Sequence, residues 1–234
     1  MNPSALKRSS RIAGLLYLVV IAGGLFAEMF VRQALFVPND VMATARNIQT
    51  HEMFYRLGFV ADLINFICGL PVIAFFYLLL SPANRRITIV AMFFVIVSNA
   101  IAATNILHQL HPLLILDGYV GIFRADQLAA LSTMALEAQS QGYAIALVFF
   151  GFYCVFIGCL IARTRVMPKV LGIIYAIAGI CYIINSFVMF LSHGFHNPLF
   201  PYILVPSFIG ELAVALWLLI PGAKDPQAYI SHTA

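Results

Sequence analysis

The chain has 234 residues, of which 62% are hydrophobic and only 9% are charged, and its mean hydropathy is +0.96. Soluble domains carry about 25% charged residues, so this composition excludes a soluble globular domain and indicates an integral membrane protein. The net charge of +4 does not point to nucleic acid as a partner, because the basic residues gather at the ends of apolar runs.

Six apolar runs are long enough, or nearly long enough, to cross a bilayer as helices. They lie at residues 12–31, 57–80, 87–111, 142–162, 170–191 and 203–220. The first run follows three basic residues, as a secretory signal would, but it is longer than the apolar core of such a signal, so we interpret it as a retained span. The sequence therefore predicts an all-α integral membrane protein, a six-transmembrane-helix bundle. It forms one domain over residues 1–222, followed by a cytoplasmic tail at 223–234.

Two connections between the spans are themselves amphipathic. Residues 40–55 begin with Asp40, a residue type that often caps helices, and they repeat apolar residues at near-helical spacing. Residues 125–140 show the same pattern through Leu128 and Leu131. Both segments are predicted to be short amphipathic helices on the outer face of the membrane.

Basic residues are distributed unevenly between the two ends of the predicted spans. Nine lie on the side of the two termini and four on the other side, which places both termini in the cytoplasm. The nine are Lys7, Arg8, Arg11, Arg85, Arg86, Arg163, Arg165, Lys169 and Lys224, and the four are Arg32, Arg46, Arg56 and Arg124.

Acidic residues within the apolar runs are the best indication of a function. Glu28, Asp62 and Glu211 each lie where a carboxylate costs about 2.5–3.5 kcal/mol, so the folded protein must compensate them. Polar residues from all six spans share their depth in the outer half of the membrane, which predicts a pocket open to the periplasmic side. The predicted lining is Glu28, Arg32, Arg56, Asp62, Asn105, His108, Tyr143, Asn185 and Glu211.

Each of these residues also has a purely structural interpretation. Glu28 and Arg32, like Glu52 and Arg56, have the i,i+4 spacing at which ion pairs form within one helix. The acids of the second and sixth spans could instead be tied to Arg56, and buried amides could hydrogen-bond neighbouring spans. Packing is the favoured interpretation for any single residue, and a pocket is favoured for the whole set.

Two His-x-x-His pairs are weak candidates for metal ligands on the outer side. They are His108 with His111 and His193 with His196. Residues i and i+3 share a helix face, so a pair could hold a metal if a carboxylate completed the set, but we assign no metal. Pro112 is expected to end regular structure directly after the first pair.

Other motifs give no cofactor and no catalytic group. The four cysteines form no Cys-x-x-Cys pair and are expected to be inert, buried thiols. There is no nucleophile motif, phosphate loop or nucleotide fingerprint, so no cofactor is expected. Gly151 and Gly158 are seven residues apart, which is not the spacing of the Gly-x-x-x-Gly packing motif.

Several short strings, taken in order, resemble a bacterial multi-pass membrane family known only as a domain of unknown function, family 4386. They are Arg11-Ile-Ala-Gly14, Phe26-Ala-Glu-Met-Phe-Val-Arg32, Arg56-Leu-Gly-Phe-Val-Ala-Asp62, Gln141-Gly-Tyr143, Pro168-Lys-Val-Leu-Gly172 and Ile209-Gly-Glu-Leu212. The resemblance covers about residues 11–222 and implies a six-span protein of the bacterial inner membrane. It implies no activity and no catalytic residue.

Two classes of function follow from these observations. The first is a receptor, sensor, accessory subunit or transporter that binds a small polar or amphiphilic ligand in the charged pocket. The alternative is a membrane-embedded enzyme that uses Asp62 or Glu211 as an acid or base on a lipid-borne substrate. Binding is preferred, because a charged pocket needs no catalytic motif and none is present.

Overall fold

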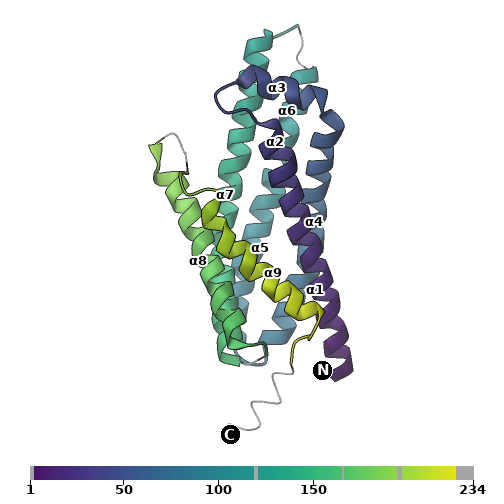
Figure 1. The fold of residues 1–234 in the computed structure, drawn as a ribbon, viewed down its shortest axis with the longest axis vertical. Coiled ribbons are helices and arrows are strands. Elements are labelled where there is room, and N and C mark those ends of the chain that lie inside the picture. Colours follow the sequence, from purple (N-terminus) through teal and green to yellow (C-terminus); the bar gives the residue numbers. More distant parts are fainter. Residues whose placement is uncertain (1–2, 119–120, 165, 194–196, 225–234) are drawn as a thin grey trace. The chain divides into compact units, whose positions relative to one another are not determined.

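The computed structural model describes residues 3–118, 121–164, 166–193 and 197–224, and the regular elements in these ranges are helices (Figure 1). Six helical segments are long and apolar enough to cross a membrane, which confirms the predicted fold class. They are Ser4–Leu35, Glu52–Leu80, Arg85–Gly118, Ala125–Thr164, Lys169–Leu191 and Tyr202–Leu219. Arg165, His196 and residues 225–234 of the predicted tail lie outside the described residues.

The helices divide into two compact units, which we describe separately. Unit 1 comprises Met1–Ile21, Ile67–Asn99 and Ala144–Ala234, and unit 2 comprises Ala22–Phe66 and Ala100–Tyr143. Four of the six spanning segments contribute residues to both units. The single domain expected over residues 1–222 stays a prediction.

The first span is interrupted by a π-helix. It runs as α1 (Pro3–Leu25), a π-helix (Phe26–Arg32) and α2 (Gln33–Leu35) without leaving helical geometry. π-Helical turns are rare and occur frequently at functional sites. This one contains Glu28 and Arg32, two of the residues predicted to line a pocket.

The amphipathic segment after the first span forms α3 (Val41–Thr50), close to the predicted boundaries. Asp40 caps it, because its side-chain oxygen accepts a hydrogen bond of 2.8 Å from the backbone N–H of Ala43. His51 ends α3, and α4 (Glu52–Leu80) begins at the next residue. This arrangement confirms the helix and cap expected at 40–55.

The third span is longer than predicted. It consists of α5 (Arg85–Asn105) and α6 (Leu107–Gly118), which meet at Ile106. The expectation that Pro112 ends regular structure is wrong, because α6 continues six residues beyond it. Proline is tolerated inside membrane helices where neighbouring groups can satisfy the freed backbone carbonyl.

The segment expected as a second surface helix is helical but is not a separate element. Residues 125–140 form the first part of α7 (Ala125–Thr164), which continues through the fourth span without a break. Between these two stretches the sequence has Gln141 and Gly142, and neither stops a helix as proline would. The amphipathic periodicity therefore predicted that residues 125–140 are helical, but not that this helix continues into the fourth span.

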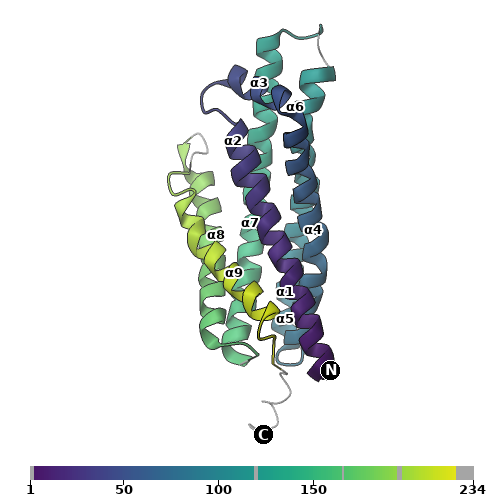
Figure 2. The same cartoon turned by 45° about the vertical axis from the view of Figure 1, so that its right-hand side comes forward.

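In unit 1, α8 (Lys169–Leu191) and α9 (Val205–Leu219) run side by side, as both ribbon views show (Figures 1 and 2). Helix α8 also packs very closely against α7 through glycines. A Cβ atom added to Gly158 would lie 2.5 Å from the carbonyl oxygen of Gly172, and one added to Gly151 would lie 2.6 Å from that of Gly179. Gly151 and Gly158 therefore form two contacts with a pair on α8 that has the same spacing, which the sequence analysis did not foresee.

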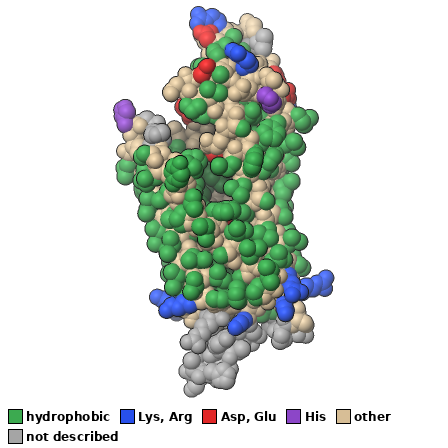
Figure 3. Space-filling model, viewed as in Figure 1, with side chains coloured by type: hydrophobic (Ala, Val, Ile, Leu, Met, Phe, Trp, Pro, Cys, Tyr) green, Lys and Arg blue, Asp and Glu red, His purple; other side chains and the backbone are tan. Residues whose placement is uncertain are grey.

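Each unit has its own buried core. Tyr17, Phe76 and Tyr175 are among the fully or nearly fully buried side chains of unit 1, and Val31 and Tyr55 are among those of unit 2. Large hydrophobic side chains also cover much of the surface of the helices, as Figure 3 shows for one face. A surface of this kind is suited to lipid and supports the assignment to a membrane.

Candidate functional site

In unit 2, Arg32 lies between two carboxylates. Its Nε donates a hydrogen bond of 2.7 Å to Oε2 of Glu28, and its Nη1 forms an ion pair with Oδ2 of Asp62. Nη1 also donates to the side-chain oxygen of Gln109, at 3.3 Å. We call Glu28, Arg32, Asp62 and Gln109 the Arg32 cluster. Its three charged residues sum to one negative charge.

The π-helix positions two members of this cluster. The carboxylate of Glu28 accepts one hydrogen bond from Arg32, four residues later in the chain, and another from the side-chain nitrogen of Gln33, five residues later. The hydrogen bond from Gln33 is 2.8 Å long. Asp62 comes from α4, and its side chain is 11% exposed, against 12% for Arg32. The ion pair between the two helices is therefore well shielded from solvent.

Gln109 brings α6 into the cluster and has an unused donor. The residue is fully buried, and its Nε2 has no hydrogen-bond partner among the described residues. Its backbone carbonyl, by contrast, accepts a hydrogen bond of 2.6 Å from the hydroxyl of Tyr55. Leaving a buried donor unpaired costs about 1–3 kcal/mol, so such a group calls for an explanation.

In unit 1, Glu211 is compensated in a different way. It is 7% exposed, and among the described residues it forms no ion pair. Its Oε1 accepts a hydrogen bond of 2.5 Å from the hydroxyl of Tyr182, and the hydroxyl of Tyr17 is close enough to interact with it. Tyr17 also shares a hydrogen bond of 2.9 Å with Tyr175. We call Tyr17, Tyr175 and Tyr182 the tyrosine cluster.

Two other predicted lining residues have partners that do not belong to the Arg32 cluster. Arg56 pairs with Glu52 at 2.6 Å, and both side chains are substantially exposed, at 50% and 42%. This is the i,i+4 pair of the structural interpretation. Asn105 is buried and donates a hydrogen bond of 2.7 Å to the backbone oxygen of Gln139, which joins α5 to α7.

The remaining candidates are not members of the Arg32 cluster. Tyr143 is 38% exposed, and Asn185 belongs to unit 1, where it accepts a hydrogen bond of 2.7 Å from Asn197. The rings of His108 and His111 are edge to face with centroids 5.3 Å apart. Within the described ranges, no group of three or more His, Cys, Asp and Glu residues could hold a metal ion. A single pocket lined by all nine predicted residues would need both units and stays a prediction.

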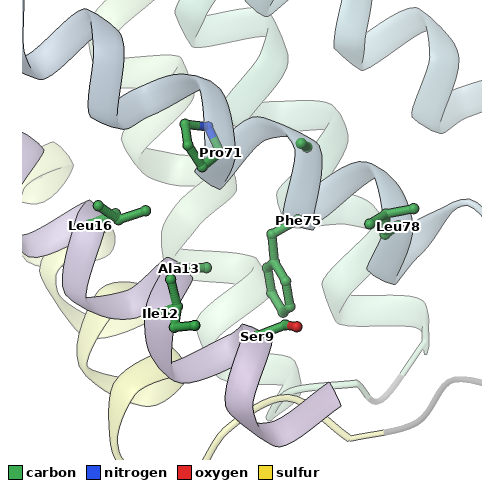
Figure 4. Close-up of a pocket in the computed structure, with 8 residues that line it drawn as sticks. Ser9, Ile12, Ala13, Leu16, Pro71, Phe75 and Leu78 are labelled. Atoms are coloured by element: carbon green, nitrogen blue, oxygen red, sulfur yellow. The ribbon is translucent and has the colours of Figure 1, made fainter. Parts of the chain in front are cut away.

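Two surface grooves are formed within the units. A groove of about 260 Å³ in unit 1 lies between α1 and α4, and Ser9 is the polar exception in its apolar lining (Figure 4). The lining is Ser9, Ile12, Ala13, Leu16, Pro71, Ala74, Phe75 and Leu78. A groove of about 280 Å³ in unit 2 includes Arg46 and Gln49. Neither contains a residue that was predicted to line the pocket.

Apart from Arg32, the sequence analysis did not assign the partners of the buried acids to the site. Gln109 follows Asn105 by four residues, the spacing at which two residues share a face of one helix, but the structure divides this stretch between α5 and α6. Tyr17 and Tyr175 were not among the candidates of the sequence analysis. No local pattern connects either residue with Glu211, because the contacts are between distant parts of the chain.

Comparisons with known proteins add a family but no activity. An uncharacterized protein of the archaeon Archaeoglobus fulgidus is 29% identical over 148 residues, which cover 63% of this chain and 73% of that protein. No solved structure matches the chain. Residues 12–222 match the family described as "Domain of unknown function (DUF4386)", and this match covers both the Arg32 cluster and Glu211. The resemblance seen in the sequence is thereby confirmed, and the chain belongs to this family of membrane proteins of unknown function.

Proposed function

We propose that this protein binds a small polar or amphiphilic ligand through the Arg32 cluster, as a receptor, sensor, accessory subunit or transporter. The observation that carries the proposal is the fully buried amide nitrogen of Gln109, which forms no hydrogen bond of normal geometry among the described residues although it is close enough to the carboxylate of Asp62 to interact with it. A purely structural network would be expected to satisfy its buried donors. The adjoining π-helix supports the same interpretation.

The charges of the cluster favour a particular kind of ligand. Nη2 of Arg32 forms no hydrogen bond within the described ranges, so Arg32 and Gln109 each present an N–H donor in the same network. The two carboxylates outweigh the single guanidinium. A ligand that offers neutral oxygen acceptors, such as carbonyl or hydroxyl groups, satisfies these donors without adding a second anion.

We place this site on the periplasmic side of a bacterial inner membrane, with both termini in the cytoplasm. Nine basic residues on the terminal side against four on the other support this orientation. Figure 3 shows Lys and Arg side chains gathered at the end of unit 1 where the first helix begins.

Single cysteines introduced into a cysteine-free variant should test this orientation in intact cells. A membrane-impermeant thiol reagent is expected to label Arg46→Cys, in α3, and to leave Arg85→Cys, at the start of α5, unlabelled until the cells are opened. The reverse pattern would place the Arg32 cluster on the cytoplasmic side.

The binding proposal is tested by Gln109→Met, which keeps the length of the side chain and removes both of its hydrogen-bonding groups. The unpaired donor is lost with the amide, so we expect the free protein to keep its thermal stability or gain up to about 1 kcal/mol. We expect ligand occupancy to fall at least tenfold, since a donor is removed from the site. Mass spectrometry of small molecules extracted from purified protein measures the occupancy.

Gln127→Met is the matched control, because Gln127 is an exposed glutamine of α7 in the same unit. It should leave occupancy unchanged. Equal occupancy in wild type and Gln109→Met, together with a fall in stability for Gln109→Met, would make Gln109 a packing residue and refute the proposal. A molecule recovered in covalently altered form would favour the enzyme alternative instead.

A further inference from the structure

The three acids singled out within the apolar runs of the sequence are compensated in two different ways. Glu28 and Asp62 share the guanidinium of Arg32, whereas Glu211 is hydrogen-bonded by tyrosine. An ionised carboxylate that is buried without a cation is so unfavourable that such a group takes up a proton instead. The difference in partners therefore implies a difference in protonation.

We propose that Glu211 is a proton-binding site, and that it holds a proton as a neutral carboxylic acid in the resting protein. This inference concerns unit 1 and does not depend on the ligand site proposed in unit 2. According to this proposal Glu211 binds a proton, whereas the sequence analysis had suggested that it contacts a small polar or amphiphilic ligand.

The groups of unit 1 that interact with Glu211 come from three helices, and among the described residues of this unit none of these groups is a cation. Tyr17 lies on α1, Tyr153 and Cys154 lie on α7, and Tyr175 and Tyr182 lie on α8. All of them are neutral when protonated, and Tyr153, Cys154 and Tyr175 are buried. Ionised Glu211 would thus face a set of groups that can offer hydrogen bonds but no balancing charge.

The hydroxyl groups next to Glu211 allow one oxygen of the carboxyl group to accept a hydrogen bond and the other to carry the proton. Tyr182 donates to Oε1, which leaves Oε2 to carry the proton. The hydroxyl of Tyr17 is within range of the carboxyl group and is paired at 2.9 Å with that of Tyr175, so it can accept from Glu211 while donating to Tyr175. A neutral carboxylic acid satisfies this arrangement without a buried charge.

Infrared difference spectroscopy of the purified full-length protein tests the proposal. Wild type minus Glu211→Gln is expected to show, at neutral pH, the carbonyl stretching band of a protonated carboxylic acid. Raising the pH should convert this band reversibly into carboxylate bands while circular dichroism reports an unchanged fold. Because glutamine resembles the neutral acid in shape and hydrogen bonding, Glu211→Gln should also keep the melting temperature of wild type.

Tyr182→Phe provides a second variant that retains the ring and removes only the hydroxyl. It should shift the same carbonyl band to higher frequency, since one hydrogen bond to the carboxyl group is lost. Glu137→Gln is the control, because Glu137 is exposed on α7 and its loss should remove carboxylate bands alone. Carboxylate bands in the Glu211 difference spectrum at neutral pH would overturn the proposal, as would a carbonyl band that Tyr182→Phe does not move. Neither result would affect the ligand test on Gln109, so the two proposals can fail separately.

Discussion

Arg32→Gln is expected to destabilise the protein by about 3–5 kcal/mol, the largest effect of any single substitution proposed for it. Arg32 is the cation for two acids, and its side chain and that of Asp62 are each nearly nine-tenths buried. Glutamine retains hydrogen-bonding capacity but leaves Asp62 without a cation, so this acid either stays charged in a buried position or takes up a proton, and both cost free energy relative to the ion pair. Thermal or denaturant unfolding in detergent measures the loss.

Arg56→Gln is the matched control, because Arg56 also pairs with a glutamate four residues away but in a substantially exposed position. It should change stability by no more than about 1 kcal/mol. Adding Asp62→Asn to Arg32→Gln removes the stranded charge and should restore a large part of the lost stability. If Arg32→Gln is no more harmful than Arg56→Gln, the buried ion pair does not hold the π-helix to α4.

The spans could be predicted from composition because every backbone group in lipid must be paired within its own helix. This rule sets the length of an apolar run without reference to any other part of the chain. Helix ends were less predictable. Residues 125–140 have an amphipathic pattern and the residues that follow are apolar, yet one helix contains both stretches. The apolar pattern changes there because the surroundings of the helix change, while its hydrogen bonding continues.

The candidate site could be predicted only in part, for a related reason. The sequence identifies Glu28, Asp62 and Glu211 as unfavourable in lipid, because that is a property of each residue alone. Which group compensates each acid depends on contacts between helices, and these have no local signal. Arg32 was correctly suggested for Glu28 from their spacing. The tyrosine next to Glu211 is 29 residues away in the chain and belongs to another helix.

A buried polar residue in a membrane helix can therefore be stabilised by different kinds of partner, and the structure shows which kind each residue has. Asn105 is satisfied by a backbone oxygen and acts in packing, Asp62 is satisfied by a cation, and Glu211 is satisfied by hydroxyl groups. In the described part of the chain, the buried nitrogens without a hydrogen-bond partner are Nε2 of Gln109 and the indole Nε1 of Trp217, and of these two Gln109 belongs to a charged network. This difference supports the proposals of ligand binding in unit 2 and proton binding in unit 1.

Gly158→Ala and Gly151→Ala should each destabilise the protein by about 1–3 kcal/mol, since each adds a methyl group where helix α8 leaves no room. The new Cβ atoms would lie 2.5 Å and 2.6 Å from backbone oxygens of α8, which cannot move aside as a flexible side chain can. The two glycines are two helical turns apart, so the effects should add in the double variant.

Gly69→Ala is the matched control for this prediction, because Gly69 also lies inside a spanning helix of unit 1 but has its nearest outside atom 4.0 Å from an added Cβ. Alanine favours helix over glycine by up to about 1 kcal/mol, so this variant should be as stable as wild type or slightly more stable. Denaturant unfolding in detergent compares wild type, the three single variants and the double variant. If Gly158→Ala matches Gly69→Ala, helices α7 and α8 do not approach as closely as described. The seven-residue spacing of the glycines would then have no role in packing.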